Sequence, residues 1–229
     1  MKRIVVLTGA GMSAESGVST FRDNNGLWQN HRFEDVASPE AWASDPELVL
    51  EFYNQRRKQL FEVEPNIGHK ALVRLQEKFD VRIVTQNVDD LHERAGSDHV
   101  LHLHGELKKA RSTMDPSLVY ELKHWELKRG DLCAKGSQLR PHVVWFGEPV
   151  PMMNEALKLA RSADIFLVVG TSMVVYPAAG LIHSVDSSAP KYYIDPKAFE
   201  MHGIENLKII QRTAVKGVPR WVDLMLERA

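Results

Sequence analysis

A glycine-rich turn that directly follows a short apolar run constrains the fold of this chain more than any other feature. Residues 4–7 (Ile-Val-Val-Leu) predict a buried strand, and Gly9, Gly11 and Ala14 follow it in the order G-x-G-x-x-A. This spacing lets the backbone turn tightly and approach a pyrophosphate, which binds N–H groups at the start of the next helix. Glycines also occur in such turns for steric reasons alone, so the turn by itself leaves both interpretations open.

The segment after this turn departs from an ordinary dinucleotide-binding fold. In that fold a second strand follows the first helix and ends in an acidic residue about 20 residues further on. Residues 20–29 are instead polar, aromatic and glycine-containing, without the alternation of a strand. We therefore expect a long loop over the cofactor at the place where a strand usually lies.

Further apolar or β-branched runs predict the strands of one sheet. They lie at 3–8, 81–85, 99–103, 142–146, 164–170, 191–195 and 207–210. Most are separated by helical signals such as Ser38-Pro39-Glu40 and Asp45-Pro46-Glu47, in which an N-cap residue, a first-turn proline and an acid follow one another. The predicted helices span about 45–62, 66–79, 151–162, 177–187 and 219–228. This alternation predicts an α/β fold with a largely parallel sheet.

The composition excludes several classes of protein. The 229 residues are 44% hydrophobic and 26% charged, as expected for a globular chain with a sizeable core, and the net charge of −1 at pH 7 suggests neither nucleic acid nor a membrane as partner. The first apolar run is too short for a signal peptide, and no run could span a membrane. The single cysteine, Cys133, excludes an intrachain disulfide. These features predict a cytoplasmic location.

Polar side chains follow two of the predicted strands. Gln86, Asn87 and Asp89 come after the strand at 81–84, at the edge where open parallel sheets bind ligands. They could hydrogen-bond a ribose and a carboxamide, or they could form a turn in which Asp89 caps the helix that begins near Leu91. Gly170-Thr171-Ser172, at the end of the run 164–170, would allow close approach to a phosphate or ribose.

The run 99–104 alternates, so His102 and His104 are expected to share one strand face. Neither has a neighbouring carboxylate or cysteine in the sequence that would complete a metal-ligand set, and His102 is most simply a structural residue. Because Gly105 follows His104, that imidazole is expected at the rim of the sheet, where it could act as a general base.

Residues 140–148 predict an edge strand that is introduced by Pro141 and ended by Gly147. The edge of such a strand could bind an extended peptide, although core packing would explain the apolar residues 143–146 equally well.

Together these motifs resemble the sirtuin family of NAD-dependent protein lysine deacylases. The matching segments are Gly-Ala-Gly-x-Ser at 9–13, Ser16-Gly17, Thr20-Phe21-Arg22, Gly26-Leu27-Trp28, Thr-Gln-Asn-Val-Asp at 85–89, His104-Gly105-Glu106, Phe146-Gly147-Glu148 and Gly170-Thr171-Ser172. They follow the order of the family over nearly the whole chain. The resemblance implies a single catalytic domain, 1–229, in which a Rossmann-like part (about 1–28, 69–106 and 141–229) carries a smaller module made by two insertions (about 29–68 and 107–140).

The resemblance also implies which residues bind NAD, the co-substrate, and which bind the acylated lysine of a protein held as an extended peptide. The residues for NAD are Gly9, Ala10, Gly11, Ser13, Ala14, Phe21, Arg22, Trp28, Gln86, Asn87, Asp89, Gly170, Thr171, Ser172, Asp195 and Ala214. His104, Asn87 and Asp89 are the implied catalytic residues, with His104 as the base for a ribose hydroxyl. The residues for the substrate are Val143, Phe146, Gly147 and Glu148, with the loop 173–176.

Asp195 departs from the family, which typically carries asparagine at this position. A carboxylate there could accept a hydrogen bond from the ribose 2′-hydroxyl and would repel a 2′-phosphate, so it favours NAD over NADP.

Tyr53 and Arg56 suggest which acyl group is removed. They lie three residues apart in the helix predicted over 46–62, so they share a face and could bind a carboxylate together. Alternatively, the cationic run Arg56-Arg57-Lys58 is a solvated helix face. Tyr-x-x-Arg in this helix resembles the class III branch of the family, which removes succinyl, malonyl and glutaryl groups.

The sequence also lacks the zinc ligands that family members usually carry as two Cys-x-x-Cys pairs. Residues 110–115 contain no cysteine, and residues 133–136 contain only Cys133, so we expect no zinc and a buried, unreactive Cys133. An apolar core on two short strands is predicted to replace the metal. Its residues are Leu118, Tyr120, Leu122, Trp125 and Leu127.

Two other functions stay open at this point. A nicotinamide-dependent oxidoreductase shares the glycine turn but has a second strand and an acidic residue that this chain lacks. A non-catalytic NAD-sensing module would share the binding motifs, and the presence of His104, Asn87 and Asp89 argues against it.

Overall fold

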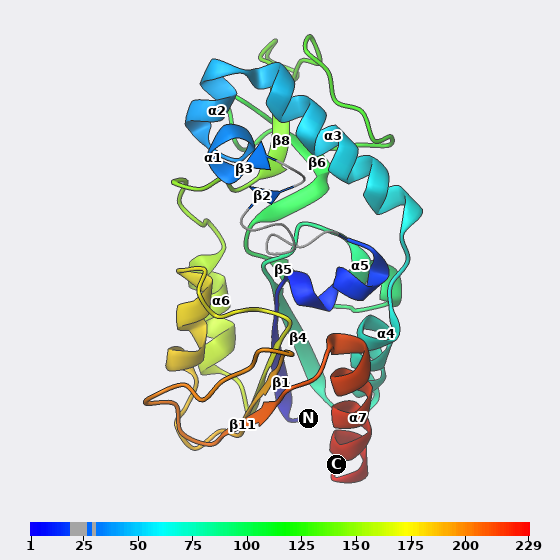
Figure 1. The fold of residues 1–229 in the computed structure, drawn as a ribbon, viewed down its shortest axis with the longest axis vertical. Helices are drawn as coiled ribbons and strands as arrows, with labels where there is room; N and C mark the ends of the chain where they lie inside the picture. The colour runs from blue at the N-terminus through cyan, green and yellow to red at the C-terminus, as the bar shows by residue number, and fades with distance from the viewer. Residues whose placement is uncertain (19–26, 29–30) are drawn as a thin grey trace.

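A six-stranded parallel sheet forms the larger part of the molecule (Figure 1). The computed structural model describes residues 1–18, the backbone of residues 27–28, and residues 31–229. The strand order is β11-β10-β9-β1-β4-β5, and every pairing is parallel. The strands are β1 (Arg3–Thr8), β4 (Asp80–Thr85), β5 (Val100–His102), β9 (Ile165–Val169), β10 (Lys191–Ile194) and β11 (Leu207–Ile210). The predicted α/β fold with a largely parallel sheet is therefore confirmed.

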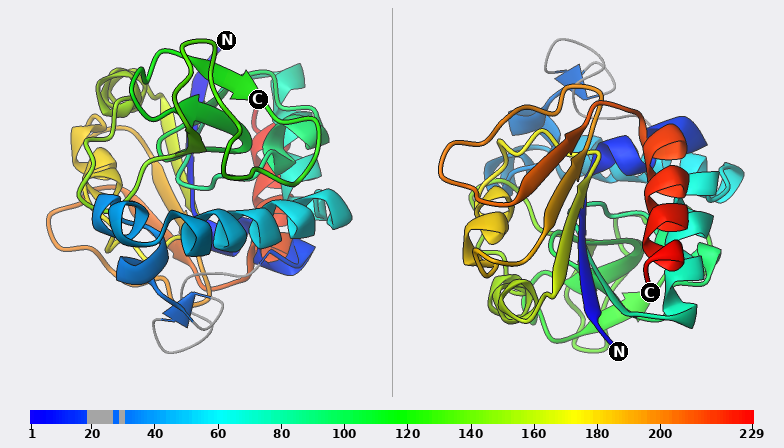
Figure 2. Two further views of the ribbon diagram at one scale, coloured as in Figure 1. Left: turned by 90° about the horizontal axis from the view of Figure 1, so that it is seen from above. Right: turned by 90° about the horizontal axis from the view of Figure 1, so that it is seen from below.

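Helices cover both faces of this sheet (Figure 2). α4 (Ile67–Arg74) and α7 (Ala214–Glu227) pack on one face, while α6 (Met153–Arg161) and the 3₁₀ helix η4 (Ala178–Ser184) pack on the other. β1 is buried on both sides, because Ile4 and Val6 belong to one apolar cluster while Val5 and Leu7 belong to the other. A strand that is buried on both faces has a continuous apolar run in its sequence, as β1 does. The chain turns to opposite sides of β1 to form β4 and β9, so the carboxyl end of β1 is the switch point where open α/β sheets bind ligands.

A small module sits beyond the carboxyl edge of the main sheet. It contains β6 (Gly105–Ser112), β7 (Val119–Glu121) and β8 (Leu139–Val143), which form an antiparallel sheet in the order β7-β6-β8. The helices α1 (Phe33–Val36), α2 (Pro39–Ser44) and α3 (Pro46–Glu62) complete the module, with the short strands β2 (Leu27–Trp28) and β3 (His31–Arg32). As predicted, Ser38 and Asp45 cap α2 and α3, because their side chains accept the N–H groups of Ala41 at 3.0 Å and Leu48 at 2.9 Å.

Several predicted elements differ from the structure. The strand expected at 142–146 lies earlier, as β8, and Pro141 is inside it, which is tolerated because β8 is an edge strand of the small sheet. The last helix starts at Ala214, five residues before Pro219, because Thr213 and not the proline marks its beginning. β6 was not predicted, because its register with β8 shifts between Gly105 and Ala110 and so breaks the alternation of a regular strand.

The predicted apolar core of the small module is confirmed in part. Cys133 is buried with Leu50, Ala110, Leu127 and Leu139, and four partly buried side chains pack against this cluster, namely Trp42, Leu118, Tyr120 and Leu122. Residues 118–122 supply one short strand, β7, as expected. Its partner is β6, and residues 125–127 form no strand. Among the described residues, no helix combines the length and the apolar character needed to cross a lipid bilayer.

Candidate active site

A cleft of about 660 Å³ separates the carboxyl edge of the main sheet from the small module. The loops after β1, β4, β9 and β10 line one side, and α3 with the segment after β8 lines the other. All the predicted NAD-binding and catalytic residues whose side chains the structure describes line this cleft, and so do the predicted substrate residues except Met173, which is buried in an apolar cluster. Phe21 and Arg22 lie outside the described residues, and only the backbone of Trp28 is described.

The glycines of the first turn bring two loops of the main chain into close contact. A Cβ atom on Gly9 would lie 2.6 Å from Cβ of Thr171, and one on Gly11 would lie 2.8 Å from Cα of Gly170. The Gly11 N–H donates to the Gly170 carbonyl at 2.8 Å, so this group is not available to a phosphate. The turn continues as two short 3₁₀ helices, η1 (Ala10–Met12) and η2 (Ala14–Ser16), where the sequence predicted one regular helix.

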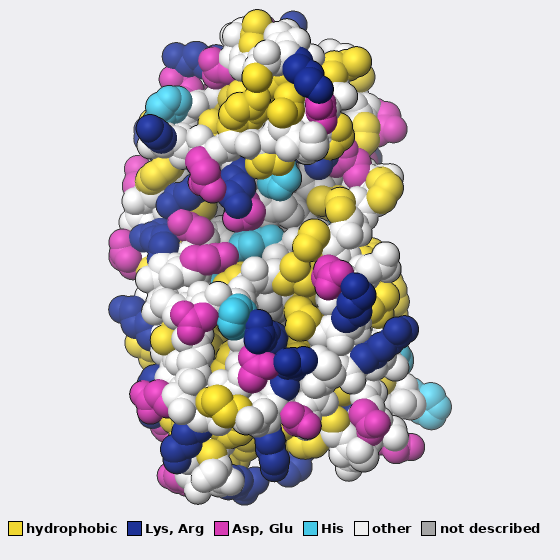
Figure 3. All heavy atoms as spheres, turned by 180° about the vertical axis from the view of Figure 1, so that it is seen from behind, with side chains coloured by type: hydrophobic (Ala, Val, Ile, Leu, Met, Phe, Trp, Pro, Cys, Tyr) yellow, Lys and Arg dark blue, Asp and Glu magenta, His cyan; other side chains and the backbone are white. Residues whose placement is uncertain are grey.

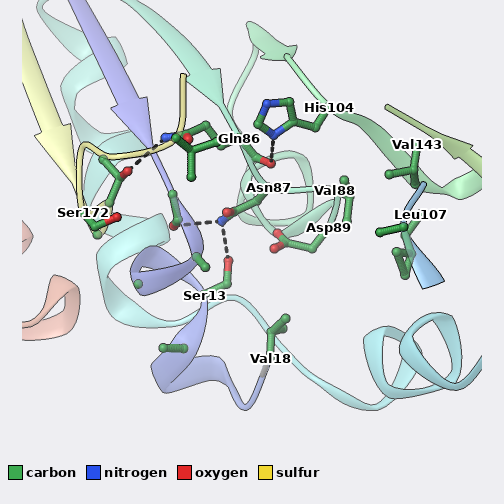
Figure 4. Close-up of a pocket in the computed structure, with 18 of the residues that line it drawn as sticks. Ser13, Val18, Gln86, Asn87, Val88, Asp89, His104, Leu107, Val143 and Ser172 are labelled. Carbon is green, nitrogen blue, oxygen red and sulfur yellow. Dashed lines mark hydrogen bonds between the residues drawn. The ribbon is translucent and has the colours of Figure 1, made fainter. Parts of the chain in front are cut away.

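The loop after β4 presents polar side chains to the cleft (Figure 4). The Asn87 amide donates to the Gly9 carbonyl and to Oγ of Ser13, both at 3.1 Å, and Gln86 donates to Oγ1 of Thr171 at 3.1 Å. Asp89 accepts the N–H of Leu91 at 3.2 Å, so it serves the turn as well as lining the cleft. Burial raises the pKa of the Asp89 carboxyl above its ordinary value.

His104 lies at the rim of the sheet, just before β6 (Figure 4). Its Nδ1 lies 3.0 Å from the Gln86 carbonyl, which can only accept, so Nδ1 carries a proton and the neutral ring has its lone pair on Nε2. Burial lowers the pKa of His104, although the Gln86 carbonyl opposes the shift. A neutral imidazole that lines the cleft with a fixed tautomer can act as a general base.

His102 has charged neighbours that its sequence context did not show. Its Nδ1 lies 3.0 Å from the Asn87 carbonyl, and its Nε2 lies 2.7 Å from Oε1 of Glu93. Side-chain atoms of Glu93, His102 and Glu106 lie within 4.8 Å of one another, so the expectation that no carboxylate stands near His102 was wrong. The fold brings α5 (Leu91–Ala95) and β6 to the end of β5, which residue spacing alone cannot reveal.

Tyr53 and Arg56 project from α3 into the cleft, and both are buried. The alternative of a solvated cationic face fails for two of its three residues, because Arg56 is 7% exposed and Arg57 is 0% exposed, whereas Lys58 is exposed. The indole N–H of Trp145 donates to the Tyr53 hydroxyl oxygen at 3.1 Å. Burial raises the pKa of Tyr53 to about 12 and lowers the pKa of Arg56 to about 10, so at neutral pH the phenol is protonated and the guanidinium is charged.

Glu148 supports the wall of the cleft formed by the segment after β8. Its carboxylate accepts two hydrogen bonds from Arg140, at 2.7 and 3.0 Å, and one from the Trp145 N–H at 2.8 Å. The Arg140 guanidinium lies 3.3 Å from the centre of the Trp145 ring. These contacts fix the turn that carries Phe146 and therefore the position of Trp145 over Tyr53.

Sequence reasoning missed several residues that line the cleft. Trp145 lies within a segment that was interpreted as possible core, and its indole N–H was the signal for a buried polar contact. Val88 and Leu107 are apolar and carry no chemical signal, although both line the cleft near Asp89 and His104. Lys197 lies on the loop after β10, whose approach to the cleft depends on the tertiary fold.

Comparisons with known proteins agree with this geometry. A model described as the Sir2 family matches residues 9–177. A Bacteroides thetaiotaomicron protein named NAD-dependent protein deacylase is 52% identical over 231 residues, which cover 99% of each chain. The solved structure of a Sir2 homologue with NAD has a TM-score of 0.89 and 39% identity, and the match covers 99% of this chain and 90% of that one. A Sir2 structure with a deacetylated p53 peptide and 3′-O-acetyl-ADP-ribose has a TM-score of 0.80 and 29% identity over 99% of this chain and 93% of that one.

Proposed function

Since this chain belongs to the Sir2 family and is an NAD-dependent protein deacylase, we propose that it removes succinyl and malonyl groups, as well as acetyl groups, from protein lysines. The enzymatic assignment sets aside the two alternatives considered above, an oxidoreductase and a non-catalytic module. The proposal concerns the acyl group, and the observation that carries it is the burial of Tyr53 and Arg56 together in the cleft.

These two side chains have the chemistry needed to bind a carboxylate. Arg56 keeps its positive charge at neutral pH, since its pKa stays near 10 in spite of burial, and a guanidinium can hold a carboxylate through two parallel hydrogen bonds. Because the Trp145 N–H already occupies a lone pair of the Tyr53 oxygen, the phenol is oriented and keeps its own proton to donate. An acetyl group ends in a methyl and has no carboxylate for these two side chains to bind.

The other side of the cleft has the groups that the reaction requires. NAD supplies the nicotinamide leaving group and the ribose hydroxyl that accepts the acyl group. Gln86, Asn87 and Asp89 provide amide and carboxyl groups suited to a ribose and a carboxamide, and Nε2 of His104 can take a proton from a ribose hydroxyl. These polar side chains in a largely apolar cleft, together with its volume, fit a bound dinucleotide.

An extended acyl-lysine peptide is the expected protein substrate. Val143, Phe146 and Gly147 line one wall of the cleft, and the loop residues Val174 and Val175 line it as well. Apolar walls of this kind suit the methylene chain of a lysine, while the peptide backbone can hydrogen-bond to the chain on either side. The peptide in the compared Sir2 structure supports this arrangement.

The test compares kcat/KM for succinyl-lysine and acetyl-lysine peptides in Arg56→Met. Loss of a charged, two-point hydrogen bond should lower succinyl activity by about tenfold to a hundredfold and leave acetyl activity within about threefold. Lys58→Met is the matched control, because Lys58 is an exposed cation two residues further along the same helix. An equal loss of both activities in Arg56→Met, with an unchanged melting temperature, would refute the proposed acyl preference.

A further inference from the structure

Two histidines at the end of β5, His102 within the strand and His104 two residues after it, hold consecutive carbonyl groups of the loop that follows β4. His104 Nδ1 donates to the Gln86 carbonyl at 3.0 Å, and His102 Nδ1 lies at the same distance from the Asn87 carbonyl. The two rings differ in what faces the second nitrogen. The His104 ring lines the cleft. Nε2 of His102, in contrast, lies 2.7 Å from the Glu93 carboxylate.

The His102 ring stands between two groups that can only accept hydrogen bonds. A carbonyl oxygen faces one ring nitrogen and a carboxylate faces the other, while a neutral imidazole has a single N–H. Only the doubly protonated ring can donate to both. On loss of one proton, a nitrogen lone pair must face either the Asn87 carbonyl or the Glu93 carboxylate, and one of the two contacts opens.

The charges around His102 favour the protonated ring. Burial alone lowers the pKa of His102, but the hydrogen bond and negative charge of Glu93, the Asn87 carbonyl and the charge of Glu106 together raise it above its ordinary value. The Glu106 carboxylate also forms an ion pair with Lys109, whose Nζ lies 2.7 Å away. The other titratable groups that interact with His102 are His92, whose own pKa burial holds well below the ordinary value, and Asp89.

The backbone that His102 holds belongs to the loop 86–89, whose side chains we assign to the ribose and the nicotinamide carboxamide of NAD. The side-chain amide of Asn87 donates to Gly9 and Ser13. The backbone N–H of Asn87 donates to Oγ1 of Thr85 at 3.0 Å, and its backbone carbonyl faces His102. Rotation of the peptide after Asn87 would move Asp89, two residues further along. Figure 3 shows histidine side chains among acidic and basic ones near the middle of the back face of the molecule.

We propose that His102, held by Glu93, is a positioning residue of the deacylase reaction, whose doubly protonated ring clamps the Asn87 carbonyl and so keeps the nicotinamide-binding loop in place. His102 makes no contact with the reacting groups in this role. NAD use and nicotinamide inhibition should therefore weaken as the pH rises and the ring loses a proton, while peptide binding stays unchanged. The proposal is independent of the acyl preference, since an acetyl-lysine peptide serves as substrate throughout.

Two variants of His102 separate its two hydrogen bonds. In His102→Asn the amide nitrogen can occupy the place of Nδ1 and donate to the Asn87 carbonyl, whereas in His102→Gln it reaches the place of Nε2 and donates to Glu93. Glu93→Gln provides a third arm, because its amide can donate to the lone pair of a neutral His102 whose Nδ1 still holds Asn87. His99→Asn, at an exposed histidine in the same run, is the control.

The measurements are KM for NAD, kcat, the inhibition constant for nicotinamide, and the pH dependence of kcat/KM for NAD. We expect His102→Gln to raise KM for NAD and the nicotinamide inhibition constant by about tenfold, with little change in KM for the peptide. In His102→Asn, by contrast, both constants should stay within about threefold of the wild-type values. His102→Asn and Glu93→Gln should also lose the decline of kcat/KM at alkaline pH.

Three results would overturn the proposal. One is equal behaviour of His102→Asn and His102→Gln in folded protein, as judged by melting temperature. Another is an alkaline decline that persists unchanged in both His102→Asn and Glu93→Gln. The third is a change in the pH profile when a chelator is added. That result would show that Glu93, His102 and Glu106 bind a cation in place of the hydrogen bond between His102 and Glu93.

Discussion

Arg57→Met tests what holds the small module together in a chain that lacks the two Cys-x-x-Cys pairs. The Arg57 side chain is 0% exposed, and its Nε donates to the Leu107 carbonyl at 2.6 Å. Its Nη1 donates to the Asn54 side chain at 2.8 Å and to the Trp125 carbonyl at 2.5 Å. Asn54 in turn makes two hydrogen bonds with the backbone of Leu127, at 3.0 and 2.9 Å. These contacts tie α3 to β6 and to the segment before Cys133.

The expected loss of stability follows from the carbonyl groups that the substitution leaves without a donor. Methionine keeps the apolar stem but removes every N–H group, so the buried Leu107 carbonyl loses its donor at a cost of about 1–3 kcal/mol, and the partly buried Trp125 carbonyl loses its donor at a smaller one. Removal of a buried charge offsets part of this cost, because burial disfavours the guanidinium and lowers the pKa of Arg57 to about 10. We expect a net loss of about 1.5–3 kcal/mol in the free energy of unfolding.

Urea unfolding and melting temperature measure this effect, each with and without a chelator. A loss of about 1.5–3 kcal/mol corresponds to a melting temperature lower by about 3–12 °C for a chain of this size. Lys58→Met is the control, since Lys58 is exposed and its Nζ only approaches the Trp125 ring, at 5.5 Å from the ring centre, so its loss should change stability by less than about 1 kcal/mol. We also expect the chelator to leave the wild-type curve unchanged. The reasoning fails if Arg57→Met is as stable as Lys58→Met, or if the protein contains stoichiometric zinc whose removal unfolds it.

Three further predictions concern the cleft. His104→Ala should lower kcat by about 10²–10⁴-fold with NAD affinity nearly unchanged, and near-normal turnover would exclude His104 as the base. Because burial lowers the pKa of His104 below 6.5, the wild-type ring is neutral above that pKa, and kcat should fall only as the pH drops through it; an acid limb centred above 6.5 would contradict this. Trp145→Phe removes the N–H that orients Tyr53, so kcat/KM for a succinyl peptide should fall by about threefold to tenfold while that for an acetyl peptide changes little.

The main sheet could be predicted because its strands carry local signals. β1 and β9 are continuous apolar runs, as expected of strands that are buried on both faces, and the caps Ser38 and Asp45 mark their helices within one turn. The polar residues of the cleft could be placed because parallel strands end at a common edge. Gly9 and Gly11 form the turn after β1, as predicted. In the structure they allow close contact with the loop after β9, a role that the sequence did not indicate.

The polar contacts of the small module could not be predicted, because they join residues far apart in the chain. Arg57 reaches Leu107 and Trp125, which lie 50 and 68 residues away, and nothing near Arg57 in the sequence distinguishes it from the exposed Lys58 beside it. Apolar alternation revealed β7 but not β6, since a shift of register makes the buried residues Leu107 and Ala110 three positions apart.

His102 and His104 show why position on a strand does not decide the role of a histidine. His102 ends β5 and His104 lies two residues further on, and both rings use Nδ1 to hold a carbonyl of the same loop. Their pKa values nevertheless move in opposite directions, since burial dominates at His104 while Glu93 and Glu106 outweigh it at His102. The shifts favour the neutral form of His104, which can accept a proton, and the protonated form of His102, which can only donate. The group that faces Nε2 sets this difference, and that group comes from α5, a helix whose approach to β5 depends on the tertiary fold.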